Sequence, residues 1–407
     1  MPVSRRLRFK LAKLKEIFHF GPMASTVKLL FSPLELRGIR LLNRLMLSPM
    51  VVYYSEDGLA NDHLFSHLTK FAVGGFGLVF TEAAAVEERG RISYGDLGIW
   101  KDEHIAPLRR ITDFIRSRGV ISGLQLAHAG HKGSYQRAYE GYQPLGEKDA
   151  ARGEPPWETI APSAIAYGAG VPSPREMTRT DIAQVQEAWC KAAMRGIAAG
   201  FDVLEIHGAH GYLIHEFLSP LTNERSDSYG GDLKGRMRFG LELAKSLREI
   251  WPDDKPVSFR LSIIDGVDKG WGIEDSITFV RELKKIGIDL VDCTSGGTAK
   301  LTRKDALPRE PGFHVPLAEI LRKETGMATI VVGLITEPAQ AETILSEGRA
   351  DLIALGRAAL NDPNWPLHAS LALGSELDYS AWPQEYGWWL ERRAKTAAKM
   401  KVEPTKK

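Results

Sequence analysis

Residues 203–220 read VLEIHGAHGYLIHEFLSP, a short apolar run that ends in a glycine-rich turn bearing histidines and a tyrosine. Neighbouring side chains of a strand point to opposite faces, so Leu204 and Ile206 share one face while Glu205 and His207 share the other. An apolar face of this kind is typical of a strand that packs against a helix. The stretch therefore predicts a strand that delivers polar side chains to a functional turn.

Similar apolar runs recur along the chain and alternate with helical segments. The candidate strands are Leu45–Ser48, Leu78–Glu82, Ile121–Leu126, Val203–Ile206, Val257–Leu261, Leu290–Thr294, Thr329–Val332 and Leu352–Leu355. The clearest helical segments are Ile182–Ala199, Arg236–Ile250 and Ser276–Ile286, the last of them ended by Gly287. Strands that alternate with helices indicate a parallel sheet, and eight strands favour a closed (β/α)8 TIM barrel. An open doubly wound sheet is the alternative, but residues 48–54 lack its glycine-rich turn.

Three parts of the chain differ in composition. We expect residues 1–26 to be a disordered basic extension; a membrane-surface helix, an organelle-targeting peptide and a true start at Met23 are the alternatives. Residues 27–373 are expected to form the barrel, with Gly130–Arg175 as an excursion or small hairpin over its top. Residues 374–407 form a Trp-rich tail, in which Trp388 and Trp389 are candidates for a subunit contact and for entry into a neighbouring active site.

The composition of the 407 residues excludes several classes of function. The net charge of +2 gives no reason to expect a nucleic acid partner, and no apolar stretch approaches the ~20 residues of a membrane span. Cys190 and Cys293 cannot supply an iron–sulfur cluster or a four-cysteine zinc site. Because nothing calls for an oxidising compartment, we expect a cytoplasmic protein.

Polar side chains on three predicted strands should converge inside the barrel. Gln125, His207 and Arg260 lie opposite the apolar faces of their strands, near the C-terminal ends, where barrel active sites form. His207 and His210 have the spacing of metal ligands, but Gln125 and Arg260 are poor ligands and His215 is the only further candidate nearby. The alternative, which we favour, is that both histidines donate hydrogen bonds to an oxyanion and Tyr212 supplies a proton.

Glycines after the last strands predict a phosphate site. Ser295 with two following glycines, Gly333, and Gly356 with Arg357 come directly after strands six, seven and eight. In barrel enzymes the backbone N–H groups of the last two such loops bind phosphate, and Arg357 adds a positive charge. The sequence thus predicts a phosphate-bearing cofactor.

Together these residues resemble the old yellow enzyme family of FMN-dependent ene-reductases, over about Leu30 to Leu373. The most specific stretch runs from Glu205 to Pro220 and continues with Asn223-Glu224-Arg225 and Asp227-Ser228-Tyr229-Gly230-Gly231. The supporting motifs are Asn43-Arg44, Ser48-Pro49-Met50, Asp96-Leu97-Gly98-Ile99-Trp100, Gln125-Leu126-Ala127-His128-Ala129-Gly130, Ala161-Pro162-Ser163 and Asp289-Leu290-Val291-Asp292.

The resemblance implies a role for each candidate residue. FMN would be bound by Pro49, Met50, Ala83, Gln125, Arg260, Ser295, Gly333, Gly356 and Arg357. Hydride would pass from NADPH or NADH through flavin N5 to the Cβ of an electrophilic alkene, an α,β-unsaturated carbonyl or nitro compound. His207 and His210 would bind the oxygen of this substrate, Tyr53 would line its pocket, and Tyr212 would protonate Cα. The family pattern implies no metal and favours a homo-oligomer, a dimer or tetramer.

The sequence is most similar to the xenobiotic-reductase, thermophilic-like branch of the family, with one departure beside the flavin. That branch has a cysteine directly after Ser-Pro-Met, where this chain has Val51, so we expect Val51 to tune the flavin. Reduction of nitroesters, quinones or dienoyl thioesters on the same fold is an alternative function. A metal-dependent barrel hydrolase and a non-catalytic scaffold are further alternatives from other classes.

Overall fold

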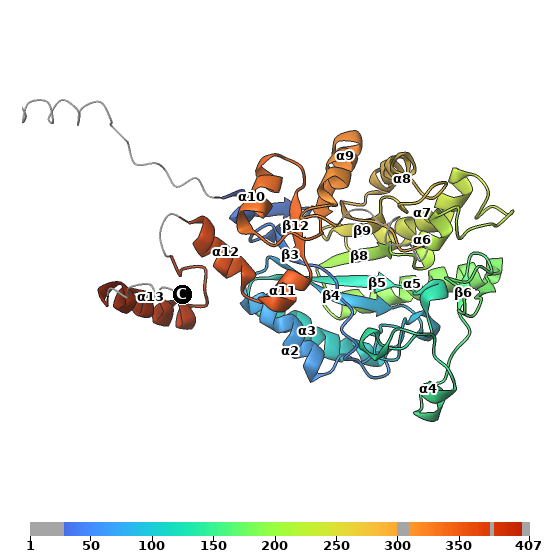
Figure 1. Ribbon diagram of the computed structural model, residues 1–407, viewed down its shortest axis with the longest axis horizontal. Helices are drawn as coiled ribbons and strands as arrows, with labels where there is room; N and C mark the ends of the chain where they lie inside the picture. The colour runs from blue at the N-terminus through green and yellow to red at the C-terminus, as the bar shows by residue number, and fades with distance from the viewer. Residues whose placement is uncertain (1–27, 299–308, 375–377, 401–407) are drawn as a thin grey trace, which may run out of the picture.

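A computed structural model describes residues 28–298, 309–374 and 378–400, and it has the predicted barrel at its centre (Figure 1). Neighbouring strands are parallel, and the sheet closes in the order β10-β11-β12-β3-β4-β5-β8-β9. The strands are β3 (Leu45–Leu47), β4 (Leu78–Ala85), β5 (Ile121–Ala127), β8 (Val203–Gly208), β9 (Val257–Ser262), β10 (Leu290–Thr294), β11 (Ala328–Val331) and β12 (Leu352–Leu355). The prediction of a (β/α)8 barrel is confirmed, and the open sheet is excluded.

Helices surround this barrel. They are α2 (Asp62–Val73), α3 (Ile105–Ser117), α5 (Arg179–Ala198), α7 (Leu233–Ile250), α8 (Ile273–Ile286), α9 (Val315–Thr325), α10 (Pro338–Ser346) and α12 (Trp365–Leu373). Local chemistry sets their ends: Thr178 and Asp181 form a capping box at the start of α5, and Gly287 ends α8 in the left-handed conformation with φ 98°. The three helices predicted from sequence, α5, α7 and α8, are present, and each begins one turn before its predicted start.

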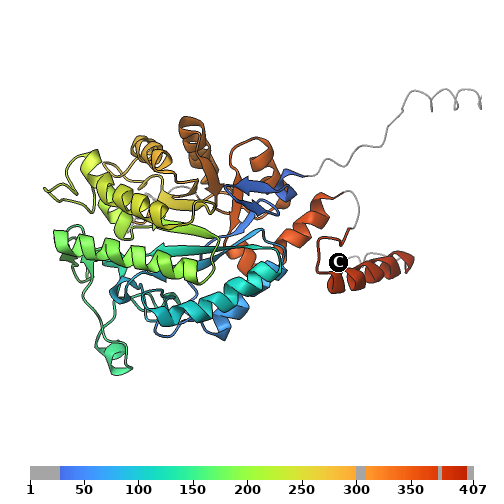
Figure 2. The same cartoon turned by 180° about the vertical axis from the view of Figure 1, so that it is seen from behind.

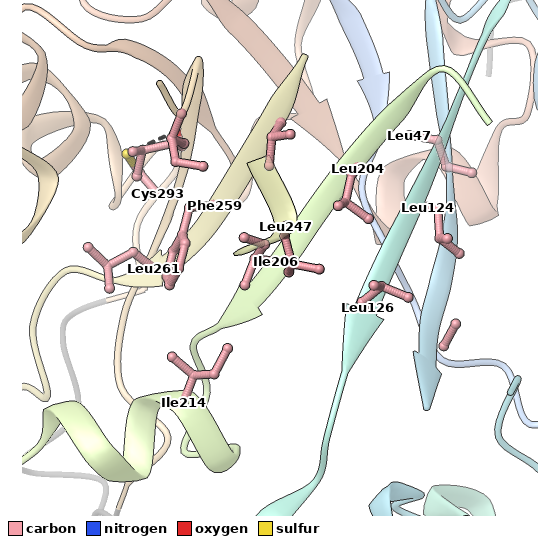
Figure 3. Close-up of a cluster of buried hydrophobic side chains, with 14 of the residues drawn as sticks. Leu47, Leu124, Leu126, Leu204, Ile206, Ile214, Leu247, Phe259, Leu261 and Cys293 are labelled. Carbon is pink, nitrogen blue, oxygen red and sulfur yellow. Dashed lines mark hydrogen bonds between the residues drawn. The ribbon is translucent and has the colours of Figure 1, made fainter. Parts of the chain in front are cut away.

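The barrel strands bury apolar side chains in two separate clusters. The larger cluster lies between the strands and the surrounding helices and includes Leu124, Ile206 and Phe259 (Figure 3). The smaller cluster fills the barrel interior near the N-terminal ends of the strands, with Met46 and Phe80 among its members. Because the outward faces are apolar, the inward faces further along β5, β8 and β9 are left for the polar residues of the site.

A hairpin that the sequence pattern did not predict closes the N-terminal end of the barrel. Strands β1 (Leu34–Leu36) and β2 (Ile39–Leu41) pair antiparallel, and Leu36 and Leu41 join the interior cluster. The chain before Lys28, including the expected basic extension, lies outside the described residues. Within the described ranges, no helix is long and apolar enough to cross a membrane.

The excursion and the tail lie at opposite ends of the molecule (Figures 1 and 2). The excursion contains α4 (Glu147–Ala151) and a two-stranded sheet of β6 (Ile160–Ala161) and β7 (Arg175–Glu176). These two strands are parallel, whereas Tyr135 and Pro144 earlier in the excursion pair antiparallel across a short turn. The tail forms α13 (Gln384–Lys399), beside α12 and on the far side of the barrel from the excursion.

Candidate active site

Five polar side chains form a layer inside the barrel above the apolar cluster of its interior. Gln125 Nε2 donates to Glu205 Oε1 at 2.9 Å, and Ser258 Oγ donates to Glu205 Oε2 at 2.9 Å. Arg260 Nε lies 3.1 Å from Asp292 Oδ2, an ion pair, but it lacks the alignment of a hydrogen bond. Burial, and then the neighbouring Asp292, raises the pKa of Glu205, while burial raises the pKa of Asp292. This layer therefore places the Arg260 guanidinium close to two carboxyl groups, Glu205 and Asp292, whose pKa values are both raised.

The turn after β8 brings the two predicted histidines and the tyrosine together. The ring centroid of His207 lies 5.2 Å from that of His210 and 5.0 Å from that of Tyr212. Burial, and then the positive charge of Arg260, holds the pKa of both histidines well below the usual value, so their rings are neutral at neutral pH. Burial also raises the pKa of Tyr212 well above 10, which keeps its phenol protonated. The cluster thus presents neutral groups that can donate hydrogen bonds.

The hydrogen bonds of this turn fix one tautomer. His207 Nδ1 accepts from the Ala209 N–H at 3.3 Å, so in a neutral ring the proton lies on Nε2. His210 Nε2 lies 3.0 Å from Thr294 Oγ1, and His210 itself has φ 60°. Residues other than glycine rarely adopt this left-handed backbone conformation, and those that do are often at functional sites.

The loop after β10 approaches this turn so closely that both sides need glycine. A Cβ on Gly211 would lie 2.0 Å from Gly297 O, and a Cβ on Gly297 would lie 2.2 Å from the carbonyl carbon of His210. His215 also anchors the turn: its Nδ1 accepts from the Gly211 N–H at 2.9 Å, and its Nε2 lies 3.0 Å from Asp265 Oδ1. His215 is therefore engaged in holding the turn. In the described ranges, no group of three or more His, Cys, Asp or Glu residues is placed to hold a metal ion.

The segment after β3 forms a second wall. Glu82, inside strand β4, accepts from the Val52 N–H at 2.7 Å and the Leu97 N–H at 3.2 Å, which fixes the backbone next to Val51. Burial raises the pKa of Glu82 to about 8. Val51 packs with Tyr212 against the small apolar cluster of Ile92, Ala129 and Tyr135. Tyr53 has φ 60°, and its ring centroid lies 6.0 Å from that of Tyr139 in the excursion.

A small cavity lies beside Tyr212. It is lined by Ala83, Ala85, Gly90, Ile92, Asp96, Ala127, Ala129 and Tyr212. Asp96 Oδ2 accepts from the Ile92 N–H at 2.6 Å, while Oδ1 has no hydrogen-bond partner among the described residues. Burial raises the pKa of Asp96 to about 7. The predicted contact residue Ala83 therefore lies in the same wall as Tyr212.

The predicted phosphate residues gather at the ends of β10, β11 and β12. Ser295 Oγ lies 2.8 Å from His314 Nε2, and His314 Nδ1 lies 2.9 Å from the Val332 carbonyl, which can only accept. Gly333 has φ 130°, and a Cβ there would lie 3.0 Å from His314 Nδ1. Gly356 precedes α11 (Arg357–Asn361), which has no side-chain cap, and Met50 Sδ lies 3.5 Å from where a Cβ on Gly356 would be. The Ser-Pro-Met segment thus reaches the phosphate end.

Comparison with known proteins identifies the family to which this chain belongs. The model of the NADH:flavin oxidoreductase / NADH oxidase family matches residues 29–375. The chain belongs to this family. A NADPH dehydrogenase of Geobacillus sp. (strain WCH70) is 42% identical over 362 residues, 88% of this chain and 98% of that protein. The NADPH dehydrogenase of Halalkalibacterium halodurans is 43% identical over 350 residues, 86% of this chain and 96% of that protein.

Solved structures agree with this placement in the NADH:flavin oxidoreductase family. A 2-naphthoyl-CoA reductase matches with a TM-score of 0.74 and 26% identity, over 83% of this chain and 51% of that chain. An old yellow enzyme homologue from Zymomonas mobilis has the same fold, with a TM-score of 0.68 and 22% identity, over 87% of this chain and 96% of that chain. The predicted relationship to old yellow enzyme is confirmed. The protein is an FMN oxidoreductase that takes electrons from NADPH or NADH.

The residues present fit FMN, the cofactor of this oxidoreductase family. Arg260 Nε is buried without a hydrogen-bond acceptor among the described residues, so it can turn toward an electron-rich ring system. At the other end, no side chain caps the start of α11 after Gly356, which leaves its first backbone N–H groups available to an anion. A cationic group at one end and a glycine cradle at the other match a redox ring and its phosphate.

Sequence patterns did not identify several residues of this flavoenzyme site. Glu205 shares the inward face of β8 with His207, and Asp292 of β10 pairs in register with Arg260 of β9, so strand alternation alone could have identified both. Strand alternation did not single out Lys132, Glu82 or His314. They act through contacts with segments 15 or more residues away, which a local pattern does not encode.

Proposed function

We propose that this FMN oxidoreductase is an ene-reductase that reduces activated alkenes, α,β-unsaturated carbonyl or nitro compounds. The observation that carries the proposal is the cluster of two neutral imidazoles and one protonated phenol after β8. FMN, when bound, supplies the transfer of hydride from the nicotinamide to the alkene. The protein must then hold the activating oxygen of the substrate and deliver one proton to carbon.

The histidine pair suits the first task. The Nε2–H of His207 and the ring of His210 donate hydrogen bonds to the carbonyl or nitro oxygen, on which negative charge grows during reduction. Since both rings are neutral, they donate without transferring a proton of their own at neutral pH. Tyr53 borders the same space from the segment after β3 and lines the substrate pocket.

Tyr212 suits the second task, protonation of Cα. Its raised pKa keeps the proton on oxygen until a carbanionic carbon forms nearby. The residues proposed to hold FMN are Pro49, Met50, Ala83, Gln125, Arg260, Ser295, Gly333, Gly356 and Arg357. Orphaned Arg260 Nε and the glycines at the strand ends support this assignment. Quinones and nitroesters remain alternative substrates, because their reduction needs no protonation at carbon.

Replacing Tyr212 with Phe tests the proposal. We expect Tyr212→Phe to slow alkene reduction by about 10²- to 10⁴-fold, the usual contribution of a general acid. Reduction of the flavin by nicotinamide and of quinones should stay within about twofold, measured by anaerobic stopped-flow absorbance. Tyr135→Phe is the matched control, because its hydroxyl is buried in the neighbouring cluster without a hydrogen-bond partner among the described residues. Equal slowing of all three reactions would contradict the role in proton transfer.

We also propose that the enzyme is a cytoplasmic homo-oligomer with α13 as a subunit contact. Tyr386, Trp388 and Trp389 on this helix are 55%, 49% and 66% exposed. Helix α13 lies on the far side of the barrel from the excursion of its own chain, which favours a contact with a second copy (Figure 1). A solution mass at a multiple of 45.1 kDa, by light scattering, supports this arrangement, and a monomer at working concentration contradicts it.

A further inference from the structure

A buried lysine joins the histidine turn to the loop after β10. Lys132 lies in the short helix η4 (Gly130–Lys132), which follows β5, and is 7% exposed. Its Nζ donates to the carbonyl oxygens of His210 at 2.8 Å and Gly297 at 3.2 Å. The ammonium is thus held by the two backbone segments that approach each other through Gly211 and Gly297.

The same ammonium lies over two tyrosine rings. Nζ is 4.4 Å from the ring centroid of Tyr167 and 5.3 Å from that of Tyr212. Among the described residues, Lys132 forms no ion pair, and the carboxyl that acts on it is that of Glu216. Burial raises the pKa of Glu216 well above its usual value, which favours the neutral form of this carboxyl. The Lys132 ammonium is thus held by carbonyl oxygens and aromatic rings and has no ion-pair partner among the described residues.

Proton donation by Tyr212 creates a negative charge close to this ammonium, which has no ion-pair partner among the described residues. When Tyr212 protonates the substrate, its O–H bond breaks, a C–H bond forms at Cα, and the electron pair of the O–H bond stays on the phenolate oxygen. The negative charge of the reduced substrate is thereby moved to the phenolate oxygen of Tyr212, and water later returns the proton. A buried phenolate needs a nearby cation, because burial disfavours the charged form.

We propose that Lys132 is a positioning residue for this proton transfer: its ammonium, held by the carbonyls of His210 and Gly297, stabilises the phenolate of Tyr212. The inference rests on the proposed ene-reductase function. It concerns only the step in which carbon is protonated, so it predicts that flavin reduction and quinone reduction do not depend on Lys132.

The pH dependence follows from the groups around the ammonium. Burial lowers the pKa of Lys132 to about 8, so the group is charged below this pH and neutral above it. The described groups that face it are Glu216 from α6 (Leu213–Leu218), His131 from η4, His207 and His210 from the turn after β8, and Tyr167 and Tyr212. The carboxyl and the tyrosines have raised pKa values, and the histidines have lowered ones. Because loss of the Lys132 ammonium removes the positive charge beside Tyr212, alkene reduction should fall as the pH rises through about 8.

A double-mutant cycle with the FMN-loaded protein tests the proposal. At pH 7 we expect Lys132→Met to slow alkene reduction at least tenfold and to remove the decline near pH 8, whereas quinone reduction stays within about twofold. Lys132→Arg should retain most of the rate and move the decline above pH 9. In the Tyr212→Phe background, Lys132→Met should have little further effect, because the two residues act on one step.

Two further measurements separate this role from a structural one. Binding of a phenolic ligand, followed by the absorbance of the bound flavin, should be within about twofold of the native value in Lys132→Met, and NMR of the Nζ nitrogen should show titration near pH 8. Lys255→Met is the matched control, because Lys255 also holds a backbone carbonyl, that of Phe201 at 2.7 Å, away from the histidine turn. It should leave alkene reduction unchanged.

The outcomes distinguish the two levels of inference. Equal slowing by Lys132→Met in the native and Tyr212→Phe backgrounds, or loss of phenol binding, would overturn the role of Lys132 and leave the ene-reductase proposal standing. A Tyr212→Phe variant that reduces alkenes at the native rate would overturn the ene-reductase proposal itself.

Discussion

The two ends of the barrel use the same eight strands for opposite purposes. At the N-terminal end, Met46, Phe80 and Val203 point inward and pack under the hairpin of β1 and β2, forming an apolar plug. At the C-terminal end, the inward positions of the strands hold polar groups such as Glu205 and Arg260. The apolar end contains side chains that lose nothing by burial, and the polar end contains groups whose pKa values burial displaces.

The difference teaches where this fold can carry unfavourable interactions. Buried charges and left-handed residues other than glycine are costly, and those of the active site, such as His210 and Tyr53, lie at the C-terminal end. The apolar plug supplies stability that does not depend on the site. Substitutions at the two ends should therefore separate function from stability.

The largest effect should come from the polar end, by replacing both histidines of the turn. We expect His207→Ala with His210→Ala to reduce alkene reduction by roughly 10²- to 10³-fold for each lost donor and to abolish phenol binding, with FMN still bound. His368→Ala is the control, because His368 is exposed and pairs with Asp362. Loss of FMN in the double variant would mean that the histidines hold the fold of the site.

A substitution in the plug should have the converse result. Phe80 is 1% exposed inside the barrel, and Phe80→Ala should lower the free energy of unfolding by about 3–5 kcal/mol, measured by urea denaturation. Phenol affinity of the folded fraction should stay within about twofold. Tyr139→Ala, at a position 72% exposed on the excursion, should change the stability by less than about 0.5 kcal/mol. A plug variant that loses phenol binding while still folded would show that the two ends are coupled.

The smallest effect should come from the wall beside the flavin. The family resemblance puts Val51 near the flavin C4 oxygen, where a hydrogen-bond donor would favour the reduced state. Val51→Thr should therefore make the reduction potential more positive, by at most roughly 30–60 mV for a charge-assisted bond of about 1.5–3 kcal/mol. A redox titration measures this, and Val52→Thr is the neighbouring control. An unchanged or more negative potential would contradict the role of Val51.

Periodicity predicted the strand-borne part of this protein and little of the loop-borne part. Because side chains alternate along a strand, the sequence alone was enough to assign Gln125, His207 and Arg260 to the barrel interior. The hairpin of β1 and β2 also alternates, but each of its strands is three residues long. Alternation over so short a run does not stand out from an irregular segment, and the hairpin therefore escaped prediction.

Contacts between distant segments left no local pattern. Lys132 lies in a stretch without regular repeats, and its ammonium donates to carbonyls 78 and 165 residues further along the chain. Glu82 was predicted as the last residue of a strand, but its carboxyl group fixes loops on both sides of it in the sequence. Such residues become visible only when the closed barrel brings the segments together.

Closure of the barrel also bears on how copies of this protein can aggregate. An open sheet offers unpaired backbone groups at its edge, to which a strand of another chain can add, as in amyloid growth. In the described part of the chain, the eight-stranded sheet has no such edge, and the remaining strands, in β1–β2 and β6–β7, are three or two residues long. While the protein is folded, association between copies must therefore use side-chain surfaces, and local opening of the barrel is what would expose it to strand-mediated aggregation.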